Sequence, residues 1–168
     1  ARIIQLRDKR RSGAELYAIA QKIRSLCTHH DARFIVNDRL DIALAVRADG
    51  VHLGQDDLPL SAARLLAPRP FIIGVSVGTV EEAVLAERDG ADYLGVGPVY
   101  PTGTKTDAGP AVGPELIRSI RENVSIPIVA IGGINLSNAG DVLAAGDDGI
   151  AVISAVICSP DIAAASRK

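Results

Sequence analysis

Short apolar runs alternate with longer segments in which apolar residues recur at helical spacing. The runs predict strands at residues 2–7, 33–37, 50–54, 71–76, 92–97, 127–131 and 149–153. The helical patterns between them lie at 13–28, 39–47, 60–67, 79–89, 113–123 and 136–145. A last helix is expected after Ser159-Pro160, since serine and proline suit a helix cap and first turn. Strands that alternate with helices predict a parallel sheet.

A sequence pattern that recurs three times supports repeating βα units. RADGVHLG, ERDGADYLGVG and AAGDDGIAVIS each run from a helix end through glycine and aspartate into a strand. The glycine near each helix end is expected to form a left-handed cap. Such repeats favour a (β/α)₈ barrel or a doubly wound sheet.

The number of strands and their side-chain pattern favour the barrel. A TIM barrel has eight strands and typically ~250 residues, or ~200 in compact cases. Seven strands are visible, the chain opens on a strand-like run, and it contains no methionine. We therefore expect one α/β TIM-barrel domain over residues 1–168, with the first strand and helix outside this chain.

Alternate strand residues face opposite sides of a sheet. Val51 and Leu53 are expected to pack on helices, whereas His52 faces the other way, as does Asn37 of the strand before. Polar residues and glycines on this second face would line a cavity at the carboxyl ends of the strands, where barrel active sites lie. His52 itself is expected to be a hydrogen-bonded barrel residue rather than a base.

Composition narrows the class of protein. Hydrophobic residues make up 48% of the chain and aromatic residues 3%, so the core must be aliphatic. A net charge of −2 does not suggest a nucleic-acid partner. No apolar run approaches the ~20 residues of a membrane-spanning helix. Two cysteines imply no disulfide framework, which fits a cytoplasmic protein. The run Cys27 to His30 could bind a metal, but a polar helix end beside a buried cysteine is the simpler interpretation.

Charged residues gather where the predicted strands end. Asp38 and Asp57 follow neighbouring strands and could converge on one hard cation. Mg²⁺ usually takes one or two carboxylates together with water and substrate phosphate oxygens. Arg7, Lys9 and Lys105 would surround the same opening. Cations and a metal together suit a diphosphate leaving group, although each charge alone could be a solvated loop residue.

The last two strands end in a different kind of segment. Gly132-Gly133 follows one of them, and Ile153-Ser154 follows the other. Loops at these places in a barrel frequently bind a monophosphate through backbone N–H groups, and glycine permits close approach. The glycine pair could also be a simple turn.

Seven motifs in this order resemble the thiamine-phosphate synthase family. They are QLRDK (5–9), VND (36–38), HLGQDDLP (52–59), GVS (74–76), GPVYPTGTK (97–105), AIGGI (130–134) and AVIS (151–154). The resemblance implies a (β/α)₈ barrel and a Mg²⁺-dependent transferase. It would join 4-amino-5-hydroxymethyl-2-methylpyrimidine diphosphate to thiazole phosphate, giving thiamine phosphate and diphosphate by a dissociative substitution.

The resemblance also implies residue roles. Asp38 and Asp57 would hold Mg²⁺. Residues expected to contact the pyrimidine diphosphate are Gln5, Leu6, Arg7, Asp8, Lys9, Asn37, Ser76 and Lys105. Residues expected to contact the thiazole phosphate are Thr102, Gly103, Thr104, Gly133, Ile153 and Ser154. Among these, the groups expected to act in catalysis are Arg7, Lys9, Ser76 and Lys105.

Two departures from the family pattern keep alternatives open. The family commonly has GVSxHT, whereas this chain has Gly78 at the histidine position, and its first strand and helix are missing. One alternative is a thiazole tautomerase-like relative of the same fold, which would keep that histidine and lack an intact PTxTK. The other is a non-catalytic ligand-binding barrel, which would not need Asp38, Asp57 and Lys105. The oligomeric state is left open.

Overall fold

The computed structural model of the protein describes residues 1–104 and 109–167. The chain divides into two compact units, Ala1–Val75 and Ser76–Lys168. The boundary falls inside one strand, Ile72–Val77. Each unit is described by itself, and the expectation of a single domain over residues 1–168 stays a prediction.

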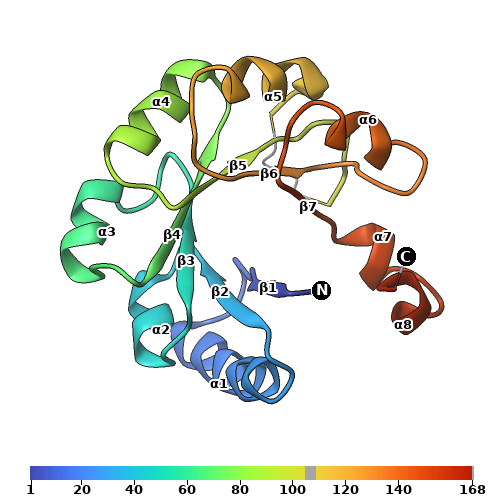
Figure 1. The fold of residues 1–168 in the computed structure, drawn as a ribbon. Helices are drawn as coiled ribbons and strands as arrows, with labels where there is room; N and C mark the ends of the chain where they lie inside the picture. Colours follow the sequence, from blue (N-terminus) through green and yellow to red (C-terminus); the bar gives the residue numbers. More distant parts are fainter. Residues whose placement is uncertain (105–108, 168) are drawn as a thin grey trace. The chain divides into compact units, whose positions relative to one another are not determined.

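Parallel strands alternate with helices along the described residues (Figure 1). The strands are β1 (Ile3–Leu6), β2 (Arg33–Asn37), β3 (Gly50–Leu53), β4 (Ile72–Val77), β5 (Tyr93–Val96), β6 (Ile128–Ile131) and β7 (Gly149–Ala151). The helices are α1 (Gly13–His29), α2 (Leu40–Ala45), α3 (Leu60–Leu66), α4 (Val80–Arg88), α5 (Gly113–Arg121), α6 (Ala139–Leu143), α7 (Ser154–Ile157) and α8 (Ile162–Ala165). All seven predicted strands are confirmed to within about two residues at each end.

In the first unit, β1 to β4 lie side by side in chain order and run parallel. Their helices α1, α2 and α3 lie on one face of the strands (Figure 1). Val51 and Leu53 of β3 are fully buried in the core with Phe34 of β2 and Leu16 of α1. The predicted alternation is therefore confirmed, and it leaves His52 on the opposite face from this helix-packed core.

In the second unit, β5, β6 and β7 are parallel neighbours. Leu94 of β5 pairs with Ile128 of β6, and both side chains are fully buried. Ile117 and Ile120 of α5 are also fully buried. Aliphatic burial of this kind holds a parallel sheet under its helices, as the composition predicts.

The repeated aspartates before the strands have a structural role in each unit. Asp49 accepts a hydrogen bond from the Phe34 N–H (2.7 Å) and pairs with Arg24 (2.5 Å). Asp148 accepts one from the Ile128 N–H (2.8 Å) and pairs with Arg121 (3.1 Å). Each aspartate thus fixes the start of the preceding strand, which explains the aspartate in two of the three repeated segments.

Two of the three predicted glycine caps are confirmed, and the third is wrong. Gly90 and Gly146 take left-handed φ values of 97° and 99°, as expected. At the end of α2, however, Arg47 takes the left-handed conformation with φ of 55°. Gly50 is the first residue of β3 instead, where an added Cβ would lie 2.3 Å from the Ile72 carbonyl oxygen. Position 50 requires glycine because the strands pack closely there, and not because it caps a helix.

The C-terminal helices also differ from the predictions. Helix α7 was not predicted, because four residues are too few to show a helical period. The last helix predicted after Ser159-Pro160 is confirmed as α8, but its predicted cap is wrong: Asp161 caps it, and the Asp161 carboxylate accepts the Ala164 N–H at 2.8 Å. Among the described residues, no helix has the length and apolar character needed to cross a membrane.

Candidate active site

The loop after β1 is organised by its own aspartate. Asp8 accepts hydrogen bonds from the backbone N–H groups of Arg10 (2.9 Å) and Arg11 (3.3 Å) and pairs with the Arg11 guanidinium at 2.9 Å. The backbone hydrogen bond from Arg10 is the largest cause that lowers the pKa of Asp8. The next helix then starts with a capping box between Ser12 and Glu15. These contacts fix the backbone on both sides of Lys9.

The turn after β2 holds Asp38 in an uncommon conformation. Asp38 has a φ of 62°, in the left-handed region that aspartate and asparagine tolerate better than most residues. Its N–H donates to the His52 carbonyl oxygen at 2.8 Å, and its own carbonyl accepts the Leu40 N–H at 3.1 Å. The backbone therefore turns sharply at the carboxyl end of β2, and this turn fixes the position from which the Asp38 side chain projects.

Asp57 is held by the loop after β3. Its Oδ2 accepts a hydrogen bond from the Gly54 N–H at 2.7 Å. A Cβ added at Gly54 would lie 3.0 Å from that same oxygen, tighter than most contacts of real Cβ atoms. Glycine at position 54 thus lets the backbone approach the Asp57 carboxylate and donate to it.

Asp38 and Asp57 form a carboxylate pair. Burial is the main cause that raises the pKa of Asp38, and the hydrogen bond and negative charge of Asp57 raise that pKa further. The Lys9 ammonium acts in the opposite direction, with Nζ at 3.5 Å from Asp38 Oδ2. Asp38 and Asp57 thus interact with each other, whereas their convergence on a metal ion stays a prediction. The contact of Asp38 with Lys9 was not predicted from the sequence.

The donor set of this pair fits Mg²⁺. Hard oxygen ligands suit the ion, and it commonly uses only one or two carboxylates because water and substrate phosphates complete its shell. No group of three or more His, Cys, Asp or Glu side chains suited to a metal occurs in residues 1–104 and 109–167. A metal at Asp38 and Asp57 would therefore depend on oxygen atoms from elsewhere, as a diphosphate supplies. The same finding gives no support to a metal cluster at Cys27 to His30.

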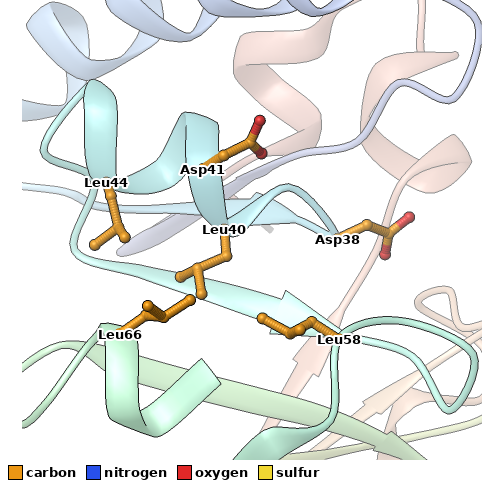
Figure 2. A pocket seen from close by; sticks show the side chains of 6 residues that line it. All are labelled: Asp38, Leu40, Asp41, Leu44, Leu58 and Leu66. Atoms are coloured by element: carbon orange, nitrogen blue, oxygen red, sulfur yellow. The ribbon is translucent and has the colours of Figure 1, made fainter. Parts of the chain in front are cut away.

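A hollow of about 430 Å³ lies beside the pair, lined by Asp38, Leu40, Asp41, Leu44, Leu58 and Leu66. In Figure 2 the side chains of Leu40, Leu58 and Leu66 point toward one another, whereas the Asp38 carboxylate points away from them. Leucines make up most of this lining, which does not suit a charged substrate. Leu44, Leu58 and Leu66 are exposed, so the hollow lies at the surface and not in the core.

In the second unit, the segment after β5 lies against the glycine pair after β6. The Tyr100 N–H donates to the Gly132 carbonyl at 3.0 Å. Gly133 has a φ of 64°, and a Cβ there would lie 2.7 Å from both the Pro101 carbonyl oxygen and the Tyr100 Cβ. The structure therefore brings Gly133 next to the segment that leads into Thr102.

Two asparagines that the sequence analysis missed hold the same turn. The Asn138 amide donates to the Gly133 carbonyl at 3.0 Å, and Asn135 donates to it at 3.4 Å. The Asn138 side chain also accepts the Asn135 N–H at 2.8 Å. The run NLSN at 135–138 carries turn-forming residues, which is the only signal that could have pointed to them.

The remaining candidate residues are placed less distinctively. Gln5 is exposed on β1, Leu6 packs against the core of the first unit, and Asn37 is half-buried at the end of β2. Ser76 is half-buried on β4, whereas Ile153 and Ser154 are exposed at the start of α7. The Thr102 hydroxyl accepts the Thr104 N–H at 3.3 Å. Lys105 lies outside the described residues. All their expected roles stay predictions, including those of Arg7 and Gly103.

The structure shows what occupies the position of the usual histidine. The Gly78 N–H donates to the Glu82 carboxylate at 2.7 Å, and the Thr79 hydroxyl accepts the Glu82 N–H at 3.1 Å. Gly78, which precedes the N-cap residue Thr79, therefore helps to hold the first turn of α4. His52 is buried, as expected for a barrel residue.

Comparison with known proteins gives one family. A family profile described as thiamine monophosphate synthase matches residues 1–156. The thiamine-phosphate synthase of Methanospirillum hungatei is 90% identical over the whole chain, which covers 82% of that protein. The thiamine-phosphate synthase of Moorella thermoacetica is 57% identical over the whole chain, which covers 80% of it.

Solved structures agree with the predicted fold class. Thiamine phosphate pyrophosphorylase from Pyrococcus furiosus is 51% identical, with a TM-score of 0.92 over 99% of this chain and 79% of that one. A 3-hexulose-6-phosphate synthase shares the fold at 19% identity, with a TM-score of 0.73 over 99% of this chain and 84% of that one. The prediction of an α/β chain of the TIM-barrel class is confirmed.

Proposed function

This chain belongs to the thiamine-phosphate synthase family and is a transferase that forms thiamine phosphate; we propose that it does so with Mg²⁺ held by Asp38 and Asp57. The substrates would be 4-amino-5-hydroxymethyl-2-methylpyrimidine diphosphate and thiazole phosphate. The products would be thiamine phosphate and diphosphate. The relatives at 90% and 57% identity are synthases, which favours this reaction over a tautomerase or a non-catalytic barrel.

The observation that carries the metal proposal is the carboxylate pair in the first unit. Burial raises the pKa of Asp38, and the neighbouring Asp57 raises it further, so the pair favours positive charge at its oxygen atoms. Bound Mg²⁺ would supply that positive charge and would stabilise the charge that develops on the leaving diphosphate. Lys9 lies beside the pair and is half-exposed, which favours a site that an anionic ligand can reach.

The proposed reaction needs positioning and charge more than a protein nucleophile. The C–O bond to diphosphate breaks first, and its electron pair leaves with the diphosphate. The aminopyrimidine ring delocalises the resulting positive charge, and the thiazole nitrogen then donates its lone pair to form the new C–N bond. Arg7, Lys9, Ser76 and Lys105 would hold the departing diphosphate during this step.

The second unit would hold the thiazole phosphate. Thr102 and Thr104 offer hydroxyl groups, and Gly133 lies beside the segment that carries them. Ile153 and Ser154 follow β7 and would contribute backbone N–H groups, since barrel loops at this place frequently bind phosphate. We also propose that residues 1–168 act as one domain and that the protein works in the cytoplasm, where two thiols without a partner disulfide are common.

The metal proposal is tested with a matched pair of variants. Asp38→Asn removes one carboxylate of the pair, whereas Asp41→Asn removes an exposed carboxylate that pairs with Arg39. We expect Asp38→Asn to lower kcat by at least ~100-fold, the scale of losing a charge-stabilising group, and to raise the Mg²⁺ concentration needed for half-maximal rate. Asp41→Asn should behave as the wild type. Equal rates in both variants would remove Asp38 as a ligand.

A further inference from the structure

Lys9 contacts one of the two carboxylates of the proposed metal site. Its Nζ lies 3.5 Å from Asp38 Oδ2. The lysine side chain is 51% exposed, whereas the Asp38 side chain is 22% exposed. An ion pair with one solvated partner gains little stability by itself, so fold stability does not explain the position of the lysine.

The charge balance of the site explains it better. Asp38 follows β2 and Asp57 follows β3, the neighbouring parallel strand, so the two carboxylates lie at the same end of the sheet. The Lys9 ammonium contacts Asp38 Oδ2 at this end. Lys9 therefore places positive charge beside an oxygen that a divalent cation would use.

A lysine side chain can place its positive charge beside Asp38 and can also move it away. The Asp8 hydrogen bonds fix the backbone around Lys9, so the start of the side chain stays in place. The four-carbon stem is flexible and half-exposed, so the ammonium can turn away without a change in the fold. A divalent cation coordinated by Asp38 would repel an ammonium on the same oxygen, and a diphosphate on that cation would offer the ammonium new partners.

We propose that Lys9 is a stand-in cation, which neutralises the Asp38–Asp57 pair before the metal binds and then turns to the diphosphate. This inference rests on the proposed metal and diphosphate site. Its consequence is that Lys9 opposes binding of the metal alone and favours binding of the metal–diphosphate complex. The residue thus couples the two events, and it is a positioning residue as well as a ligand.

The test measures binding and not turnover. Calorimetry, with electron paramagnetic resonance of Mn²⁺, gives two dissociation constants for the purified protein: one for Mn²⁺ alone and one for the Mn²⁺–diphosphate complex. We expect Lys9→Ala to bind Mn²⁺ alone at least threefold more tightly and to bind the complex at least tenfold more weakly. The controls are Arg10→Ala, which removes a charge from the same exposed loop, and Lys22→Ala, which removes one from α1. Both controls should match the wild type.

The remaining outcomes separate this inference from the proposed function. If Lys9→Ala weakens only the complex, Lys9 is a diphosphate ligand alone; the stand-in role is then overturned, but the metal site stands. If Arg10→Ala changes both constants as Lys9→Ala does, the effect is one of general charge, and the inference is also overturned. If the wild type binds neither Mn²⁺ nor the complex, both the inference and the metal proposal are wrong.

Discussion

Asp38 combines two features that rarely occur in one residue. Its left-handed backbone places the side chain at the end of β2, and its carboxylate opposes that of Asp57. Neither feature stabilises the fold, and strained or repelling groups of this kind concentrate at functional sites. The sequence predicted that Asp38 and Asp57 would converge, because both follow neighbouring strands. It could not show the left-handed φ or the Lys9 contact, which depend on local backbone geometry.

The backbone cost at Asp38 can be measured with two uncharged variants. Asp38→Asn and Asp38→Ala both remove the carboxylate, but asparagine tolerates the left-handed region and alanine does not. We expect Asp38→Ala to unfold about 1 kcal/mol more easily than Asp38→Asn, which corresponds to a difference in Tm of ~2–4 °C for a chain of this size. Equal Tm values from metal-free thermal unfolding would show that φ at this position carries no cost.

At the scale of elements, loops are positioned by neighbouring loops. The segment after β5 and the turn after β6 approach so closely at Gly133 that only glycine fits, and Asn138 holds the carbonyl of the turn. The strands could be predicted because seven aliphatic runs alternate with helices. The loop contacts could not, because a glycine pair and two asparagines resemble any turn. For the same reason, the sequence did not show that Asp161, and not Ser159, caps the last helix.

The contact at Gly133 predicts different results for alanine substitution at two glycines. Gly133→Ala would place a Cβ against Tyr100 and Pro101 at a positive φ, and we expect it to lower Tm and raise the KM for thiazole phosphate. Gly140→Ala is the control: it lies within α6, and its Cβ would meet nothing within 4 Å. Alanine favours a helix over glycine by ~1 kcal/mol, so this variant should keep its KM and not lose Tm. An unchanged KM in Gly133→Ala would separate this turn from the thiazole site.

At the scale of the whole molecule, the family motifs are shared between the two units. The carboxylate pair and the QLRDK loop lie in Ala1–Val75, whereas the PTGTK segment and the glycine pair lie in Ser76–Lys168. The order of the motifs along the chain was enough to predict the family, because it needs no knowledge of contacts. The central claim of the account is that one chain binds both substrates and joins them with the aid of Mg²⁺.

The measurement that tests this claim most directly follows both products of one reaction. The purified protein is incubated with the pyrimidine diphosphate, thiazole phosphate and Mg²⁺, and thiamine phosphate and diphosphate are both quantified. The account predicts that the two products form in a one-to-one ratio, that chelation of the metal by EDTA stops the reaction, and that added Mg²⁺ restores it. A folded protein that releases no diphosphate, or that forms thiamine phosphate equally well in EDTA, would contradict the account.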